Sequence, residues 1–499
     1  MRVALEIVLF SALILATRCA NYQDVFVGGR IYFVDADCYA RMTRVRMVAE
    51  HPGLVVRQHD FENFPAGITP HTMAPLDYLI FGLALALRPF AGQPLDLAGA
   101  IVSPLLALLG GWFLWWWSRR FEQPGRCAAL LLYGLSAILA HGTALGRPDQ
   151  QSLLIVVLLV ALAAEWTSQE KPSRGWSVVS GASWGLALWV SLYEPLVLLG
   201  GLAIFSLIGS RSQLTARFRR VGWFILLGLV LLAALVERRW PELPGGQPFF
   251  AGWSATVGEL RHVGLTNPIW LSWCGGLILL GPLLLTLALR RRSIPRVFAG
   301  LLVLSFLLTL WEARWGYFLA VVFSLTIPAQ IAVVRRKSLA WLMVAFSVLP
   351  LLQFWHGQFW PNEEVMDRRI ENRIEAAQWR AAASALAGAR REPVLAPWWL
   401  SPATAYWSGQ PVVAGSSHES LPGIVASARF FLATSPDDAR EILRRHDVHW
   451  VLAYDGERVA ENSAALLGVP APTNALCFTL DRTPSQAPRF LSLAWQNGA

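Results

Sequence analysis

Long apolar runs separated by short polar loops fill residues 1–355 of the chain. A transmembrane helix needs about 20 predominantly apolar residues, with a range of about 17–25. On that measure the pattern predicts about eleven membrane spans. The predicted spans are Val3–Ala20, Leu95–Trp117, Cys127–Leu145, Ser152–Trp166, Gly175–Leu192, Pro195–Gly209, Val221–Val236, Ile269–Leu289, Val297–Trp311, Gly316–Val334 and Leu339–Trp355. The first of them follows Met1-Arg2 and also fits a cleaved signal peptide.

A shorter apolar run, Leu76–Phe90, decides the predicted orientation. It is only about three-quarters of a span and contains Asp77 and Arg88, so we interpret it as an interfacial or re-entrant helix in a long outer loop, 21–94. The arginine-rich loops 119–126, 171–174, 211–220, 290–296 and 335–337 then share one face, which the positive-inside rule assigns to the cytoplasm. We therefore expect a multi-pass inner (plasma) membrane protein with a cytoplasmic N-terminus.

The composition changes after Trp355, where charged helical patterns alternate with short β-type runs. The helical patterns cover Pro361–Gly388 and Pro436–Arg445, and the β-type runs are Val394–Trp398, Pro411–Ala414, His449–Tyr454 and Ala475–Leu480. Such alternation indicates a small α/β domain. We predict an α-helical polytopic membrane domain over 1–355 and an extracytoplasmic soluble α/β domain over 356–499.

The composition supports a membrane protein and argues against a nucleic-acid partner. Hydrophobic residues make up 55% of the 499 residues and charged residues only 15%, whereas soluble domains carry about 25% charged residues. The net charge of +9 comes largely from arginines in the predicted cytoplasmic loops, so no polyanionic partner is needed to explain it. The five cysteines share no CxxC spacing and predict neither a zinc site nor a disulfide framework.

Acidic residues gather in the predicted outer loops. Asp35 and Asp37 stand two positions apart just after the first span, Asp149 follows Gly146 at the mouth between two spans, and Glu259 follows Thr256 in a later loop. Carboxylates on one face of the membrane can share Mg²⁺ or Mn²⁺, which neutralises a leaving phosphate. Each acid also has a plainer interpretation. Asp35 and Asp37 fit a solvated loop whose acids balance neighbouring arginines, Asp149 fits an ordinary helix-start aspartate, and Glu259 fits an exposed loop acid.

Two further outer elements carry side chains suited to substrates. Arg314, in the turn Glu312–Phe318, offers a planar fork of donors that matches phosphate, although a neutralising Arg314–Glu312 pair is the plainer interpretation. Trp398 and Trp399 open the C-terminal domain as a candidate aromatic wall for sugar or peptide, or as part of a core strand.

In order and sidedness these motifs resemble the catalytic subunit of oligosaccharyltransferase and its bacterial and archaeal relatives in the GT-C glycosyltransferase superfamily. The resemblance rests on Asp35/Asp37 with Arg41 and Arg44, Pro65-Ala66-Gly67, Gly146 with Asp149, Thr256 with Glu259, Arg314 and Trp398-Trp399. It implies a divalent metal held by Asp35 or Asp37, Asp149 and Glu259. It also implies a first-motif acid that activates the acceptor, and donor-phosphate binding by Arg314.

The chain departs from the family at two places. Gln150 and Gln151 follow the second-loop aspartate where many relatives have acids or histidine, and Leu400-Ser401-Pro402 replaces the Asp-Tyr-Gly of the WWDYG acceptor motif. The predicted function is transfer of a sugar from a polyprenyl-(pyro)phosphate donor to a protein, lipid or glycan acceptor. The rival hypotheses are a glycan or lipid transporter and a metal-independent glycan ligase or polymerase.

Overall fold

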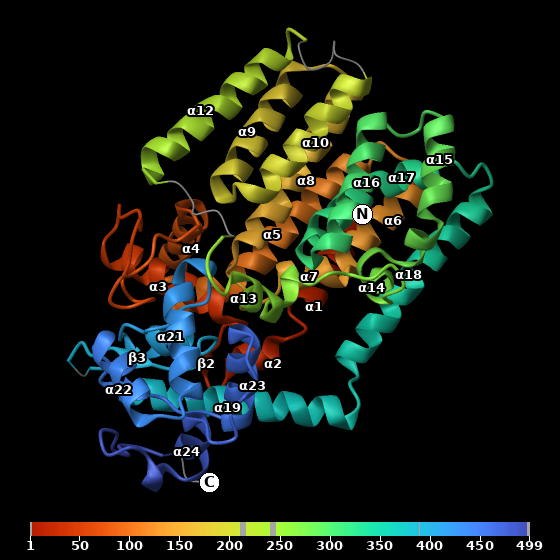
Figure 1. Cartoon of the computed structure of the whole chain (residues 1–499). Helices are drawn as coiled ribbons and strands as arrows, with labels where there is room; N and C mark the ends of the chain where they lie inside the picture. The colour runs from red at the N-terminus through yellow and green to blue at the C-terminus, as the bar shows by residue number, and fades with distance from the viewer. Residues whose placement is uncertain (1, 210–215, 240–245, 389, 497–499) are drawn as a thin grey trace. The chain divides into compact units, whose positions relative to one another are not determined.

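The computed structural model describes residues 2–209, 216–239, 246–388 and 390–496; Arg211 of a predicted cytoplasmic loop lies outside them. The chain forms two compact units, each built from three segments (Figure 1). Unit 1 consists of Met1–Phe26, Thr72–Arg238 and His262–Met366, and unit 2 of Val27–His71, Arg239–Arg261 and Asp367–Ala499. Every site residue therefore belongs to one unit or the other.

Unit 1 is a helical bundle. Its elements are α1 (Arg2–Arg18), α2 (Tyr22–Val25), α4 (Ala74–Leu87), α5 (Pro94–Ser118), α6 (Gln123–Leu135), α7 (Ala137–Gly142), α8 (Gln150–Glu170), α9 (Arg174–Val190), α10 (Tyr193–Gly209), α12 (Arg219–Glu237), α14 (Ile269–Cys274), η2 (Gly276–Leu280), α15 (Gly281–Arg290), α16 (Arg296–Trp311), η3 (Ala313–Trp315), α17 (Gly316–Ile331) and α18 (Lys337–Phe359). Among the described residues α5, α8, α12 and α18 are long and apolar enough to cross a membrane, and four shorter apolar helices accompany them. The count of eleven spans stays a prediction.

Two predicted continuous spans are wrong in detail. The run Ile269–Leu289 is divided into α14, η2 and α15 at Gly275, which has a positive φ of 71°. A Cβ at this position would lie 2.1 Å from the Ser347 carbonyl oxygen, so the break is where α18 packs against the chain. The run Cys127–Leu145 is likewise divided at Ser136, whose Oγ donates to the Trp273 carbonyl oxygen over 2.6 Å.

A buried ion pair and a close glycine contact join α8, α9 and α12, which run side by side in Figure 1. Arg219 Nη1 donates to Glu165 Oε1 over 2.9 Å, and Ser180 Oγ donates to the same oxygen. A Cβ at Gly181 would lie 2.1 Å from the Gly222 carbonyl oxygen, so the backbones of α9 and α12 approach closely. The ion pair and the close glycine contact thus hold the three helices together.

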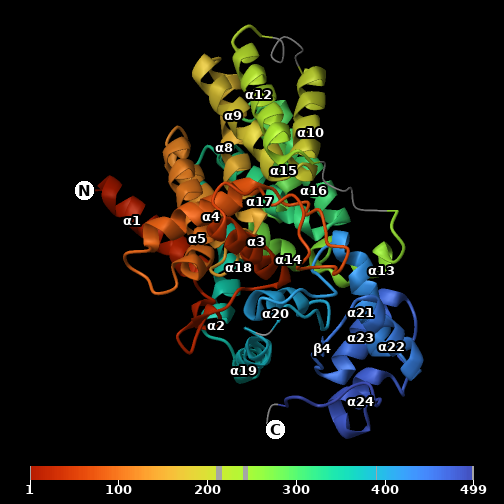
Figure 2. The same ribbon diagram turned by 90° about the vertical axis from the view of Figure 1, so that its left-hand side faces the viewer.

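Unit 2 combines α3 (Ala36–Glu50), α13 (Phe250–Thr256) and η1 (Gly258–Leu260) with most of the C-terminal elements. These are α19 (Glu363–Ala385), β3 (Val394–Leu395), α20 (Ser401–Ser408), η4 (His418–Ser420), α21 (Leu421–Leu432), α22 (Pro436–Arg445), β4 (Trp450–Val451), α23 (Gly456–Leu467), α24 (Leu476–Arg482) and η5 (Pro484–Gln486), and β1 (Phe26–Val27) pairs with β2 (Arg30–Ile31) at the start of the unit. The helices predicted over Pro361–Gly388 and Pro436–Arg445 are confirmed. Figure 2 shows α21 with α22 and α23 beside it.

The sheet of unit 2 is smaller than the sequence predicts. Among the described C-terminal residues, Val394–Leu395 and Trp450–Val451 pair in parallel, and Val412 bridges to Val394. The predicted strand Ala475–Leu480 is wrong: this segment forms α24, which buries Leu476 and Cys477 in the core. This part of unit 2 is therefore mostly helical, and Leu395 of β3 shares a core cluster with Phe430 and Phe431 of α21.

Candidate functional site

The first acidic motif lies at the start of α3 in unit 2. Asp35 is the N-cap residue, and its Oδ1 accepts a hydrogen bond from the Cys38 backbone N–H over 3.0 Å. Asp37 lies in the first turn of the helix. Asp35 is therefore a helix cap, because one of its oxygens satisfies a helix N–H group; the sequence predicted a helix-start role only for Asp149. Whether Asp35 or Asp37 is the main ligand stays open.

A cluster of two imidazoles and one carboxylate lies in the same unit. Ligand atoms of His71, His418 and Glu419 all lie within 4.8 Å of one another. His71 Nδ1 and the His71 backbone N–H each lie 2.6 Å from Glu419 Oε1, and His418 Nδ1 lies 3.5 Å from Glu419 Oε2. The Glu419 side chain is 1% exposed and the His71 side chain 34%. The cluster therefore opens to its surroundings on the His71 side.

The loop that carries His418 and Glu419 is fixed from both ends by the segment before His71. Glu62 Oε1 accepts from the Ser416 backbone N–H over 3.1 Å, and Asn63 Oδ1 accepts from the Gly423 backbone N–H over 2.9 Å. Both acceptor side chains are buried. Because buried hydrogen bonds with few competing waters hold one geometry, this loop is preorganised.

Burial and ion pairing shift the protonation equilibria of these groups. Burial alone would lower the pKa of His71, but the adjacent Glu419 carboxylate raises it, and Asp37 adds to the increase. Burial would raise the pKa of Glu419, but the His71 and His418 side chains lower it. Burial raises the pKa of Glu62 to about 7, although the nearby Arg44 guanidinium opposes the shift.

Unit 1 contributes the second acidic motif. Asp149 caps α8, and its Oδ1 accepts from the Gln150 backbone N–H over 2.6 Å. Its Oδ2 lies 3.7 Å from Arg147 Nη2, and the end of the Gln151 side-chain amide lies against both carboxylate oxygens. Asp149 is therefore both a buried helix cap and the centre of a cluster of polar groups.

A chain of hydrogen bonds extends from Arg147 into the bundle. Arg147 Nη1 lies 3.2 Å from His141 Nε2, and His141 Nδ1 lies 2.8 Å from the Tyr317 hydroxyl. Spacing along the sequence gave no sign of this arrangement, because Tyr317 comes from α17 while His141 comes from α7. It orients the arginine that lies beside Asp149.

Arg314 pairs with a partner that the sequence did not suggest. Its Nη2 lies 3.0 Å from Oε1 of Glu194, in the first turn of α10. Glu194 is nearly buried, with 5% of its side chain exposed, and Ser191 Oγ also donates to it, over 2.5 Å. The Arg314 side chain is thus held by this carboxylate and is 23% exposed.

The remaining predicted residues lie in unit 2. Glu259 is half-buried in η1, three residues after Thr256, the last residue of α13. The Trp398 and Trp399 rings meet edge to face at 5.8 Å and pack against hydrophobic core clusters of this unit. That packing accords with the core interpretation of the tryptophan pair, so substrate stacking on these rings stays a prediction.

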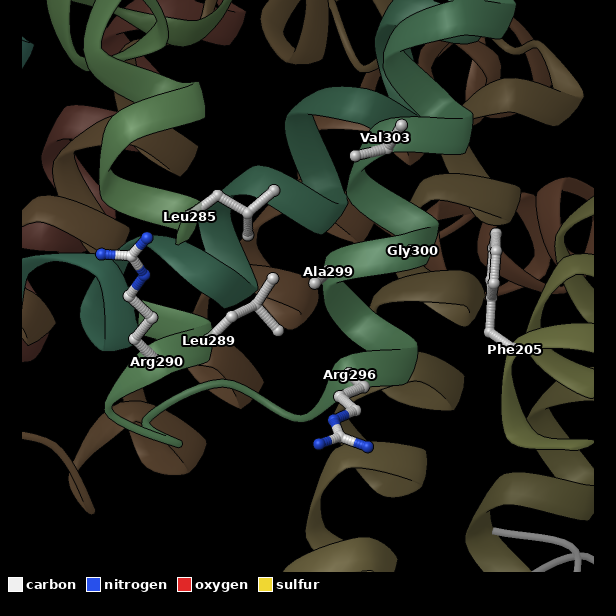
Figure 3. A pocket seen from close by; sticks show the side chains of 8 residues that line it. All are labelled: Phe205, Leu285, Leu289, Arg290, Arg296, Ala299, Gly300 and Val303. Atoms are coloured by element: carbon white, nitrogen blue, oxygen red, sulfur yellow. The ribbon is translucent and has the colours of Figure 1, made fainter. Parts of the chain in front are cut away.

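An apolar groove of about 570 Å³ lies between α10, α15 and α16 (Figure 3). It is lined by Phe205, Leu285, Leu289, Arg290, Arg296, Ala299, Gly300 and Val303. These eight residues include no carboxylate, hydroxyl, thiol or imidazole. The groove therefore offers no catalytic group, and both its arginines belong to the loop predicted to be cytoplasmic.

No protein-family model and no curated protein matches the chain. Among solved structures it is similar to the oligosaccharyltransferase of Archaeoglobus fulgidus with a tethered acceptor peptide (TM-score 0.70, 14% identity, 92% of this chain and 70% of that chain). The same archaeal enzyme, AglB, with an inhibitory peptide and dolichol-phosphate gives a TM-score of 0.69 at 14% identity, with 92% and 70% of the two chains covered. ArnT from Cupriavidus metallidurans bound to undecaprenyl phosphate gives 0.51 at 19% identity, with 93% and 89% covered. The resemblance to the oligosaccharyltransferase catalytic subunit is thus confirmed at the level of the fold, over 92% of this chain.

Proposed function

We propose that this chain is a membrane glycosyltransferase that moves a sugar or oligosaccharide from a polyprenyl-(pyro)phosphate carrier to an acceptor on the non-cytoplasmic face. The observation that carries the proposal is a fold likeness spanning 92% of the chain, combined with acids at the positions of the family's motifs. Two of the similar proteins bind dolichol-phosphate and undecaprenyl phosphate. A polyprenyl phosphate is accordingly the donor carrier that we propose.

The Asp149 carboxylate supplies oxygen donors of the kind that Mg²⁺ and Mn²⁺ prefer. The Gln151 amide nitrogen, which donates to both oxygens of this carboxylate, holds it in one orientation. Asp149, Glu259 and one of Asp35 and Asp37 would hold the ion. When bound, it would neutralise charge that develops on the departing phosphate.

The protein's own side chains supply the remaining chemistry. A first-motif carboxylate, from Asp35 or Asp37, accepts the proton of the acceptor nucleophile as that atom bonds to the anomeric carbon. The bond between this carbon and the phosphate oxygen breaks, with inversion, and the phosphate leaves on its lipid. Arg314 holds the phosphate through charge-assisted hydrogen bonds. Trp398 and Trp399 contribute aromatic rings on which the acceptor packs. The acid and the tyrosine of the WWDYG motif are replaced in this chain.

The test is transfer from a radiolabelled polyprenyl-phosphate sugar by the purified chain in detergent or vesicles. Transfer should stop with a chelator and return with Mg²⁺ or Mn²⁺. Asp149→Asn should lower turnover more than donor binding, because the cation's benefit grows as negative charge develops on the leaving oxygen. A transporter would move the lipid-linked sugar across the bilayer with its glycosidic bond intact and with chelator present. A metal-independent ligase would transfer sugar but ignore both the chelator and the substitution.

A further inference from the structure

We infer that His71, His418 and Glu419 form a binding site for a divalent transition metal of the Zn²⁺ class, with one coordination position open. These three residues are separate from the acids proposed to hold Mg²⁺ or Mn²⁺, and zinc binding by them does not depend on the proposed glycosyl transfer. Two imidazoles and one carboxylate make up the ligand set of several catalytic zinc sites, in which water or substrate takes the fourth position. Imidazole ligands favour Zn²⁺, Co²⁺ and their neighbours over Mg²⁺ and Ca²⁺.

The distances within the cluster suit such an ion. Zinc binds histidine nitrogen and carboxylate oxygen at about 2.0–2.2 Å, so tetrahedral ligand atoms lie about 3.3 Å apart. His418 Nδ1 and Glu419 Oε2 lie 3.5 Å apart, close to that spacing. His71 Nδ1 and Glu419 Oε1 are closer, at 2.6 Å, and must separate by less than about 1 Å to reach it.

An independent observation points to a ligand at the cluster. Glu419 Oε2 is buried and has no hydrogen bond of normal geometry among the described residues, and His418 Nδ1 lies 3.5 Å from it. A buried carboxylate oxygen without a donor is costly, and a cation bound between Oε2 and the two imidazoles would satisfy it. The partial exposure of His71 supplies both an entry path and the open coordination position.

The surroundings hold the ligands in place before an ion arrives. Glu62 and Asn63 fix the backbone on either side of His418 and Glu419, and the His71 backbone N–H orients the Glu419 carboxylate. Supporting hydrogen bonds of this kind raise metal affinity by fixing ligand orientation. Because His71 and Glu419 are 348 positions apart in the chain, the ion would also link two distant segments of unit 2.

The experiment is zinc content of the purified full chain after loading with Zn²⁺ and dialysis. We expect about two equivalents in the wild type, because an oxygen site that holds Mn²⁺ also holds Zn²⁺, and about one in Asp149→Asn, which weakens the proposed oxygen site. At least a tenfold loss of zinc affinity is expected in His418→Ala and Glu419→Gln. The matched control is His449→Ala, which removes an exposed histidine of the same unit and should retain zinc.

Co²⁺ provides a second measurement that needs no variant. The wild type loaded with Co²⁺ should show visible absorption bands of a four- or five-coordinate ion, and Zn²⁺ should abolish them. Equal zinc retention by wild type and Glu419→Gln would overturn the inference. So would zinc loss in His449→Ala, or a Co²⁺ spectrum of purely octahedral, aqueous type. Retention by Asp149→Asn with loss of its transferase activity would separate this site from the proposed function.

Discussion

Arg314 is proposed to bind donor phosphate, yet it also neutralises Glu194, and these two roles can be separated. Arg314→Gln removes guanidinium–phosphate hydrogen bonds worth about 1.5–3 kcal/mol, so the Kd for donor should rise about 10- to 150-fold. The same substitution leaves a carboxylate that is 5% exposed without its cation. Loss of this cation costs about 1–3 kcal/mol of unfolding free energy. We expect a cost toward the lower end of that range, because Arg314 is 23% exposed and solvent screens its charge.

The double variant Arg314→Gln/Glu194→Gln distinguishes the two effects. Removing both charges should restore much of the thermal stability, because no buried charge is left unpaired. It should not restore donor affinity, because the phosphate still lacks its guanidinium. The assays are equilibrium binding of a labelled polyprenyl-phosphate and thermal unfolding followed by tryptophan fluorescence. Recovery of both quantities together in the double variant would refute phosphate binding and leave Arg314 a purely structural role.

Two further predictions concern stability. Glu165→Gln should lower the free energy of unfolding by about 3–5 kcal/mol, because it leaves Arg219 buried and unpaired. The control Glu170→Gln removes one partner of an exposed pair with Arg120 and should change the free energy of unfolding by less than about 1 kcal/mol. Equal shifts in Tm for the two variants would contradict this prediction. The raised pKa of Glu62, about 7 against an ordinary 4.5, contributes stability that is fully present below pH 4.5 and lost as the pH rises through 7. The Tm of Glu62→Gln relative to wild type should therefore increase across that window, and a constant difference would contradict the buried neutral carboxyl.

Helices with one uninterrupted apolar run were predictable from the sequence. The helices α5, α8, α12 and α18 correspond to predicted spans because hydrophobicity and length alone specify them. The break at Gly275 was not predictable, because its cause is the approach of the Ser347 carbonyl oxygen from 72 positions away. A hydropathy pattern contains no information about such a long-range backbone contact.

The candidate site was predictable only where chemistry is concentrated in a short motif. Asp149 and Arg314 stand out because a charged residue beside an apolar run needs a partner, but Glu194 as that partner follows only from the fold. The cluster of His71 with His418 and Glu419 was not predictable for the same reason, because its members belong to segments far apart in the chain. Ala475–Leu480 was misassigned as a strand because a short apolar run does not distinguish a strand from a buried helix.

The proposed transfer depends on one divalent cation bound by Asp149, Glu259 and a first-motif acid, and Mn²⁺ binding measured by electron paramagnetic resonance is the direct test of this ligand set. The wild type should hold one tightly bound Mn²⁺ per chain. Asp149→Asn, Glu259→Gln and the double variant Asp35→Asn/Asp37→Asn should each lose it, while His418→Ala should keep it. Full retention of the ion by any one of the first three variants would contradict a shared site.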